Sequence, residues 1–338
     1  MFRSCTYSKK VKPGVVIWLS FDDFALTSDV MPIFWTRRAS TRGKIVNLRN
    51  RGLSLMLAAM VFAPVMDVLA KILSVDITGA QVVLMRFGFQ ALFLFPVVLL
   101  TIGWGGLKPQ RMGLAIIRGI LVAGAVSCFF TALKWMPVAD AIAIFFVEPL
   151  ILTVLSAVFL NETIGWRRLL AVALGLVGAL IIIRPSFELF GMASLLPLLT
   201  AILFAVYLTV TSKMTRDHHP LTLQFSAGMS AFVFMALVLA AGTYSGFDLL
   251  TYNSPTAMQW WILVCIGAIG TISHLMIVFA FKWAPASLLA PFHYLEIVVA
   301  TILGYLVFGQ FPDALKWFGI AIIVLSGLYV IWRERAEP

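Results

Sequence analysis

The sequence predicts an all-α polytopic membrane protein with ten transmembrane helices. Hydrophobic residues make up 61% of its 338 residues and charged residues only 12%, whereas soluble proteins average about 25% charged residues. The mean hydropathy is +0.99. Ten stretches approach the roughly 20 apolar residues with which a helix crosses the hydrocarbon core while satisfying its own backbone amides. These observations together indicate an integral membrane protein.

The ten expected spans follow one another from residue 52 almost to the end of the chain. They cover residues 52–72, 79–101, 112–133, 138–160, 167–183, 191–212, 221–242, 258–281, 286–308 and 315–332. An outer-membrane β-barrel would instead alternate apolar and polar side chains over segments of about ten residues. The run LLAVALGLVGALIII at 169–183 has no such alternation, which favours helices.

Residues 1–51 form a basic segment that precedes the first span. The segment holds ten Lys or Arg against three Asp, and it therefore supplies +7 of the net charge of +10. Its locally apolar part, residues 15–35, is interrupted by the three aspartates, so it has neither the length of a span nor the clean apolar centre of a signal peptide. We interpret residues 1–51 as a disordered cytoplasmic extension, with Met31 as a candidate start of the protein.

The remaining basic residues predict the orientation of the chain. With the N-terminus in the cytoplasm, nine Lys or Arg lie on the cytoplasmic side and three on the external side. The nine are Lys108, Arg111, Arg167, Arg168, Lys213, Arg216, Lys282, Arg333 and Arg335, and the three are Lys134, Arg184 and Lys316. This positive-inside bias favours a multi-pass protein of the bacterial inner membrane with both termini in the cytoplasm. There the basic segment can contact anionic lipid headgroups rather than nucleic acid.

The chain contains an internal repeat. A shift of 148 residues aligns LKWMPVADAIAIFFVEPLILTVLSAVFL (133–160) with FKWAPASLLAPFHYLEIVVATILGYLVF (281–308), so that Lys-Trp-x-Pro is followed in both by Glu. Spans three to five therefore repeat as spans eight to ten, and the odd number of spans in each unit inverts the second unit. Inverted repeats are typical of secondary transporters, whose binding sites lie between the two units. We expect the first repeat at 52–184, the second at 185–333 and a short tail at 334–338.

These residues resemble a known family. The repeated Lys-Trp-x-Pro, the mid-helix carboxylates, Asn161-Glu162-Thr163-Ile164-Gly165-Trp166 and the closing Arg184-Pro185 resemble the EamA repeat of the drug/metabolite transporter superfamily. Spans four, five and ten are similar to those of bacterial carriers of S-adenosylmethionine or riboflavin. The chain departs from the family pattern at Asn161-Glu162 and Gly309-Gln310, where Gly-Glu is usual. The resemblance implies a ten-helix carrier of a small metabolite.

Two carboxylates near the middle of spans, Glu148 and Glu296, are the first candidate site residues. A charged side chain at the centre of a bilayer costs about 2.5 to 3.5 kcal/mol on insertion scales, so both should face a shared cavity. Each can exchange a proton as access alternates between the two sides of the membrane. The alternative is a protonated Glu that joins neighbouring helices by a hydrogen bond. Pro149 and Pro291 predict kinks nearby, although proline is common in ordinary membrane helices.

Aromatic and imidazole side chains surround the second carboxylate. His293 stands three residues before Glu296, so both project from one face of the ninth span, and Phe292 and Tyr294 flank the histidine. Together with His274 in the eighth span, these side chains can hold a planar or cationic metabolite. A buried histidine bonded to a neighbouring helix is the alternative reading, and no third ligand supports a metal site.

Arg86 in the second span, one turn before Gln90, is the clearest positive group away from the membrane ends. It can neutralise a buried carboxylate or meet an anionic group of the substrate, and snorkelling to the external face is the alternative. Lys71 and Arg118 lie near enough to the interfaces to snorkel. Asp67 stands four residues before Lys71 and is spaced to pair with it.

The patterns favour a secondary carrier of a small organic metabolite, with an exporter of the same fold as the alternative. An enzyme is disfavoured because no His-Glu-x-x-His or Gly-x-Ser-x-Gly motif is present. A Walker loop is also missing, which disfavours an ATP-driven pump, and a channel would more often have rings of charged side chains. We expect no cofactor, no metal and no nucleic-acid partner. The stripe Ala171-x-x-x-Gly175-x-x-x-Ala179 is a candidate homodimer face, although packing within a monomer explains it as well.

Overall fold

The computed structural model describes residues 31–160, 165–183 and 189–309, together with short runs between 314 and 329. By its internal contacts the chain divides into two compact units, Met1–Val46 and Asn47–Pro338. The described residues form helices and short connections without strands. Residues 1–30 of the expected extension lie outside the described part, and the chain is helical from Met31 onward.

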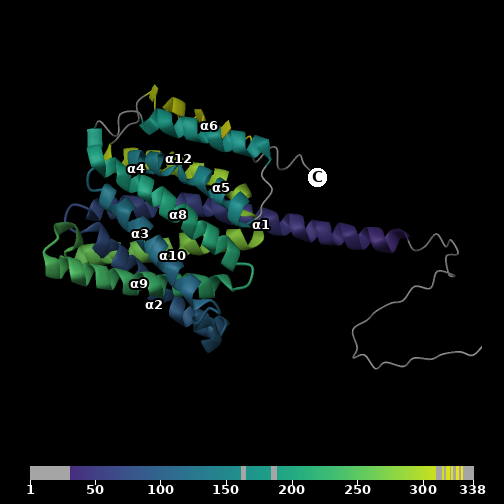
Figure 1. The fold of residues 1–338 in the computed structure, drawn as a ribbon, viewed down its shortest axis with the longest axis horizontal. Helices are drawn as coiled ribbons and strands as arrows, with labels where there is room; N and C mark the ends of the chain where they lie inside the picture. Colours follow the sequence, from purple (N-terminus) through teal and green to yellow (C-terminus); the bar gives the residue numbers. More distant parts are fainter. Residues whose placement is uncertain are drawn as a thin grey trace, which may run out of the picture. The chain divides into compact units, whose positions relative to one another are not determined.

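Between Met31 and Phe308 the described residues form eleven α-helices and four 3₁₀ turns. Figure 1 shows the arrangement of the longer α-helices. The α-helices are α1 (Met31–Leu73), α2 (Gly79–Thr101), α3 (Met112–Ala132), α4 (Val138–Phe145), α5 (Glu148–Leu160), α6 (Trp166–Ile183), α8 (Leu195–Met214), α9 (Pro220–Ser245), α10 (Ala257–Trp283), α11 (Ala286–Leu289) and α12 (Leu295–Phe308). The 3₁₀ turns are η2 (Trp104–Leu107), η3 (Gly191–Ser194), η4 (Asp248–Leu250) and η5 (Ala290–Tyr294).

Within the described part of the chain, eight segments are long and apolar enough to cross a membrane. They are Leu48–Leu73, Gly79–Thr101, Met112–Ala132, Val138–Leu160, Gly191–Met214, Pro220–Ser245, Ala257–Trp283 and Ala286–Phe308. The expected fifth span is the helix α6, whose apolar part Leu169–Gly178 is shorter than the eight membrane-spanning segments. The expected tenth span, 315–332, falls largely outside the described residues. The all-helical membrane fold is therefore confirmed, and eight of its expected spans are seen directly.

Local sequence signals set where several helices begin and end. Thr78 caps α2 by accepting a hydrogen bond from the backbone N–H of Gln81, and Thr256 forms a capping box with Gln259 at the start of α10. Such caps satisfy backbone donors that the first turn of a helix leaves unpaired. Gly309 ends α12 with a φ of 66°, a left-handed conformation that glycine adopts without steric cost. These signals fix the positions of the loops at the span ends.

Helices from the two expected repeats pack directly against one another. The helix α2 lies against α9 and α10, and α3 lies against α8 and α9 (Figure 1). A Cβ atom on Gly119 would lie 2.5 Å from the Cβ of Ser230, and one on Gly228 would lie 2.7 Å from Nε2 of Gln90. These backbones can approach so closely because glycine has no side chain. The glycines therefore help to fix which helix faces meet.

Polar contacts in the loops establish the relative direction of α2 and α9. The side-chain amide of Gln81, at the start of α2, donates to the carbonyl of Asn253 at 2.7 Å and accepts from its N–H at 2.8 Å. Asn253 follows α9, so the start of α2 lies beside the end of α9. Beyond the other end of α2, Arg111 forms an exposed ion pair of 3.7 Å with Asp217, which precedes α9. The two equivalent helices thus run antiparallel, as an inverted repeat predicts.

Large apolar side chains cover the outside of the helices. Leu92, Leu100, Leu237, Trp261 and Leu306 are between 62% and 87% exposed. In water this surface would be costly, because apolar area is driven out of contact with water. In a bilayer the same side chains meet lipid tails that are as apolar as they are. The exposed faces therefore match a chain whose solvent is lipid.

Candidate functional site

Two spans are interrupted at equivalent positions. In the fourth span α4 ends at Phe145 and α5 begins at Glu148. In the ninth span the turn η5 separates α11 from α12, which begins at Leu295. Adding the repeat offset of 148 to residues 146–147, which separate α4 from α5, gives 294–295. The two breaks therefore overlap in the repeat at the end of η5. Glu148 follows the first break directly, and Glu296 follows the second after one residue, Leu295.

A proline lies beside each break. Pro149 is the second residue of α5, and Pro291 is the second residue of η5. Proline has no N–H and clashes with the carbonyl four residues earlier, so it disrupts a continuous helix but fits the first turn of a new one. Broken helices in carriers leave backbone groups free to line a binding site. The prolines give both breaks a local physical cause.

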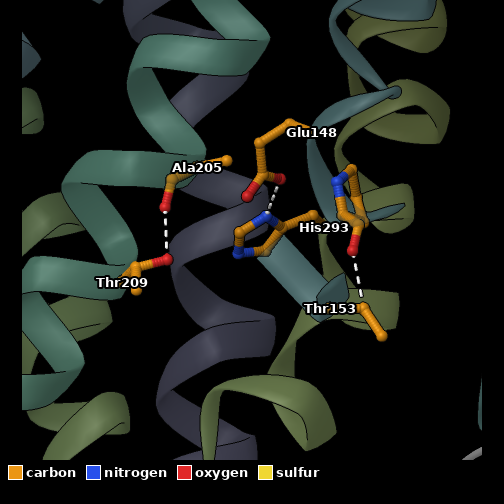
Figure 2. Close-up of polar contacts among 6 residues, drawn as sticks. Glu148, Thr153, Ala205, Thr209 and His293 are labelled. Atoms are coloured by element: carbon orange, nitrogen blue, oxygen red, sulfur yellow. Dashed lines mark hydrogen bonds and ion pairs between the residues drawn. The ribbon is translucent and has the colours of Figure 1, made fainter. Parts of the chain in front are cut away.

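The broken spans bring Glu148 and His293 together. Oε2 of Glu148 lies 2.7 Å from Nδ1 of His293, and the two side chains are 0% and 2% exposed. Figure 2 shows the imidazole pointing toward the carboxylate. Oε1 of Glu148 and Nε2 of His293 have no hydrogen-bond partner among the described residues. The pair is therefore buried, and in the described part of the chain one polar atom of each side chain is left without a hydrogen bond.

A cavity of about 70 Å³ lies beside this pair. Its polar lining consists of Asp67, Thr200, His274, His293 and Glu296. Most of the remaining wall is apolar and includes Phe129, Phe130, Phe145, Phe204, Met60 and Met66. The structure thus gathers three of the expected site residues, His274, His293 and Glu296, around one cavity. Glu148 does not line it and meets it only through His293.

Asp67 lines this cavity, although its spacing in the sequence predicted a pair with Lys71 instead. Its side chain is buried and faces the cavity, whereas Lys71 donates to the carbonyls of Leu133 and Met136. No ion pair joins Asp67 and Lys71 in the described part of the chain, so the expected pair is wrong. Residues four apart can reach each other on a helix, but packing turned these two toward different partners.

Arg86 is fully buried next to the cavity wall. Its side chain is 0% exposed, and its Nε lies 3.2 Å from Sδ of Met66. The guanidinium stacks 4.3 Å from the centre of the Phe87 ring and interacts electrostatically with Asp67. Its two terminal nitrogens have no hydrogen-bond partner among the residues described. This burial excludes snorkelling and places a positive charge behind the wall that Asp67 and Met66 form.

The expectation that Arg118 snorkels to the interface is wrong. The side chain is fully buried, and its Nε donates to the hydroxyl of Thr211 at 2.7 Å. Its terminal nitrogens donate to the hydroxyl of Tyr207 at 3.1 Å and to the carbonyl of Leu223. These partners lie on α8 and α9, so Arg118 ties α3 to helices of the second half. Its place near the start of a span suggested an interface, but hydropathy does not reveal buried partners.

Tyr294 and Gln90, two further candidates, do not line the cavity. The Tyr294 ring packs edge-on against Phe146, with centroids 5.4 Å apart, and its hydroxyl donates to the carbonyl of Val172 at 3.3 Å. Gln90 donates to the carbonyl of Gln224 at 2.8 Å and so ties α2 to α9. Tyr294 therefore joins η5 to α6, and Gln90 joins α2 to α9, so both side chains stabilise the packing around the site.

Several expectations fall on positions outside the described residues. These positions are Asn161–Ile164, Arg184, Pro185, Gln310, Lys316, Arg333, Arg335 and the tail 334–338. The centre of the small-residue stripe is described. A Cβ atom on Gly175 would lie 2.5 Å from the Tyr294 ring of the same chain, so at this position the stripe packs within the monomer.

Comparison with known proteins identifies the family. The model of the EamA-like transporter family matches residues 50–184 and 191–332. The chain belongs to the EamA-like transporter family. An S-adenosylmethionine uptake transporter of Rickettsia bellii is 30% identical over 285 residues, which cover 84% of this chain and 94% of the relative. A riboflavin transporter of Brucella anthropi is 31% identical over 247 residues, which cover 72% and 85% of the two chains.

Two further similarities extend the comparison. A pseudopaline exporter of Pseudomonas aeruginosa is 26% identical over 290 residues, which cover 83% of this chain and 96% of the relative. A crystal structure of a protein 18% identical has a TM-score of 0.67 over 85% of this chain and 99% of that one, which supports the fold. The resemblance found in the sequence is confirmed. This EamA-like protein is a multi-pass membrane transporter of small metabolites and not an enzyme.

Proposed function

We propose that this EamA-like transporter is a secondary active carrier of a small organic metabolite, that it works by alternating access and that it is coupled to protons. The observation that carries the proposal is the cavity whose polar wall holds the buried side chains of Asp67, Glu296, His274 and His293. Intramembrane carboxylates and imidazoles of this kind mark substrate paths and proton relays. In carriers with inverted repeats, such groups lie where the two repeats meet.

The size of the cavity supports alternating access. Its volume of about 70 Å³ compares with about 300 to 1,000 Å³ for clefts that bury a drug-sized ligand. The helices must therefore separate to admit a cargo and close again around it. The breaks before Glu148 and Leu295 supply points at which the two broken spans can bend. Such a motion would favour a carrier over an open pore.

The lining favours a cargo that has a planar ring and polar groups. Four phenylalanines and two histidines offer ring faces and edges for stacking. The carboxylates can accept hydrogen bonds or balance a positive charge. S-adenosylmethionine and riboflavin, the cargoes named for two relatives, both contain a planar heterocycle. We propose a cargo of this kind.

Import is the proposed direction, because the relatives that are at least 30% identical include an uptake transporter. Export, the direction named for the Pseudomonas relative, is the alternative. Accumulation of cargo in right-side-out vesicles supports import, whereas accumulation only in everted vesicles supports export. In either case we propose that the protein lies in the inner membrane with both termini in the cytoplasm.

The proposed topology can be tested at two equivalent, exposed lysines. Lys134 and Lys282 are related by the repeat offset and both lie at span ends. Single Lys134→Cys and Lys282→Cys variants, made in a chain whose native cysteines are replaced, are expected to react with an impermeant thiol reagent from opposite sides of intact cells. Labelling of both from the same side would contradict the inverted arrangement.

The carrier function is tested with purified protein in liposomes. Radiolabelled S-adenosylmethionine and riboflavin are offered with and without an imposed pH gradient. We expect uptake of one cargo to rise with the gradient and Glu296→Gln to abolish that rise. Asp248→Asn, which neutralises an exposed loop carboxylate, is the matched control and should transport like the wild type. Uptake that ignores the gradient would refute proton coupling, and no uptake of any metabolite in a wider panel would refute the carrier.

A further inference from the structure

We infer that Asp67 and Glu296 together form the charge-binding site of this carrier, and that Glu148 is a positioning residue for His293. The two carboxylates hold one positive charge between them, which is either a proton or a cationic group of the cargo. This inference rests on the proposed carrier function and assigns its chemistry to particular side chains.

The cavity places the two carboxylates in one space. Asp67 comes from α1 and Glu296 from α12, and both line the same cavity. Glu296 interacts electrostatically with Asp67 and, to a smaller extent, with Glu148. Neither forms an ion pair with a Lys or Arg side chain in the part of the chain that the structure describes, and the cavity lining contains no Lys or Arg. The wall therefore presents negative charge without a basic partner at the surface of the cavity.

The elements packed around the carboxylates contribute few other charged groups. The helix α10 contributes His274 and η5 contributes His293, while Arg86 of α2 stands behind Met66. The lining residues of α3, α4 and α8 are apolar apart from Thr200. Arg118 on α3 donates hydrogen bonds to α8 and α9 and keeps its positive charge, which acts on His274. The charge of the site is therefore set by a small group of side chains.

A charge count over this group leaves a deficit. The three carboxylates of Asp67, Glu148 and Glu296 carry three negative charges when ionised. Arg86 and Arg118 supply two positive charges. With both histidines neutral, one negative charge remains. An uncompensated charge away from water is costly, so the site must recruit a positive charge, and the carboxylates that line the cavity are the ones that it can reach.

Glu148 is excluded from this role by its contacts. Its Oε2 is bonded to His293 at 2.7 Å, and it does not line the cavity. Glu148 instead holds the imidazole in place, because the bond at Nδ1 leaves Nε2 as the free ring nitrogen. The sequence symmetry between Glu148 and Glu296 therefore does not extend to their roles.

The positions of Asp67 and Glu296 also link charge binding to conformation. Asp67 lies in the first segment matched by the family model, and Glu296 lies in the second. A positive charge between them attracts both halves, whereas two bare carboxylates repel each other. Binding of the charge is therefore expected to favour the closed cavity, and its release is expected to favour opening.

The site itself can be tested without knowledge of the cargo. Infrared difference spectra of the purified full-length protein in lipid nanodiscs are recorded as a function of pH, and the carboxylic acid band is followed. We expect one band that titrates in the wild type. Asp67→Asn and Glu296→Gln should each remove it or move its midpoint by more than about one pH unit, as for interacting carboxyls. Glu148→Gln should move it less, Asp248→Asn should not move it, and Asp67→Glu should restore it.

A transport measurement separates the two sources of charge. S-adenosylmethionine carries a sulfonium charge that S-adenosylhomocysteine lacks, and the two otherwise differ by one methyl group. If the cargo supplies the charge, wild-type protein should prefer the sulfonium compound and Asp67→Asn should lose that preference. If a proton supplies it, Asp67→Asn should instead flatten the pH profile of uptake and leave the preference unchanged.

Two infrared results would overturn the inference. One is a carboxylic acid band that Asp67→Asn leaves at its wild-type midpoint. The other is a band that Glu148→Gln moves as far as Asp67→Asn does. The infrared titration needs no cargo, so it tests the charge-binding site separately from transport. A protein that transports nothing would refute the proposed function and would leave the infrared result valid.

Discussion

Substitution of Gly175 by alanine probes the contact that holds the second broken span in place. A Cβ atom at this position on α6 would lie 2.5 Å from Cε2, 2.6 Å from Cζ and 2.9 Å from the hydroxyl oxygen of Tyr294. Carbon atoms rest at about 3.5 to 4.0 Å. The ring and the helix must therefore separate by about 1 Å to reach ordinary contact.

The Tyr294 ring has little freedom to retreat. The edge-on contact with Phe146, at a centroid distance of 5.4 Å, restrains it on one side, and its hydroxyl bonds the carbonyl of Val172 at 3.3 Å. Overpacking a core position costs about 1 to 3 kcal/mol, and loss of the hydrogen bond adds about 1 kcal/mol. We expect Gly175→Ala to lower the free energy of unfolding by about 2 to 4 kcal/mol. Because His293 precedes Tyr294, we also expect slower transport.

The assay is equilibrium unfolding in mixed detergent micelles, followed by tryptophan fluorescence. Gly304→Ala is the matched control, because Gly304 is a buried glycine in α12 whose added Cβ would meet nothing within 4 Å. We expect it to be neutral or to stabilise by about 0.4 to 1 kcal/mol. In a Tyr294→Ala background, Gly175→Ala should lose most of its penalty, since the clashing ring is gone. An equal penalty in both backgrounds would refute the steric reasoning.

Three further outcomes are expected. Gln81→Ala removes two hydrogen bonds to the backbone of Asn253 and should lower the free energy of unfolding by about 1 to 3 kcal/mol. Cysteines placed at that end of α2 should then react faster with a thiol reagent, and unchanged labelling would contradict a role in closing that end. Arg118→Met should prevent accumulation of folded protein because it removes the buried guanidinium that ties α3 to Thr211, Tyr207 and Leu223. Arg118→Lys should rescue it poorly because lysine lacks the guanidinium fork. Full rescue by lysine, scored by size-exclusion chromatography, would argue against that geometry. Arg111→Ala should change the free energy of unfolding by less than about 1 kcal/mol, since its ion pair with Asp217 is 3.7 Å long and about half exposed. A larger loss would contradict the expectation that this exposed pair adds little stability.

The sequence predicted the architecture of this protein because that architecture depends on features that can be read along the chain. Long apolar stretches are required by the thickness of the bilayer, and the 148-residue offset is a property of the chain alone. The offset also predicted the antiparallel relation that the contacts of Gln81 and Asp217 display. The positions of Glu148, His293, Glu296 and their neighbouring prolines inside spans were likewise readable, and they led to the correct part of the molecule.

Tertiary structure alone decided which polar side chains share the cavity. Spacing along a helix gives the depth of a residue in the membrane, but the rotation of the helix about its axis is set by packing, for example where α3 meets α9 at Gly119. Asp67 therefore lines the cavity although its spacing suggested a pair with Lys71, and Arg118 is buried although its depth suggested an interface. The bond between Glu148 and His293 joins residues 145 positions apart, a distance along the chain over which only the packed fold can bring two side chains together.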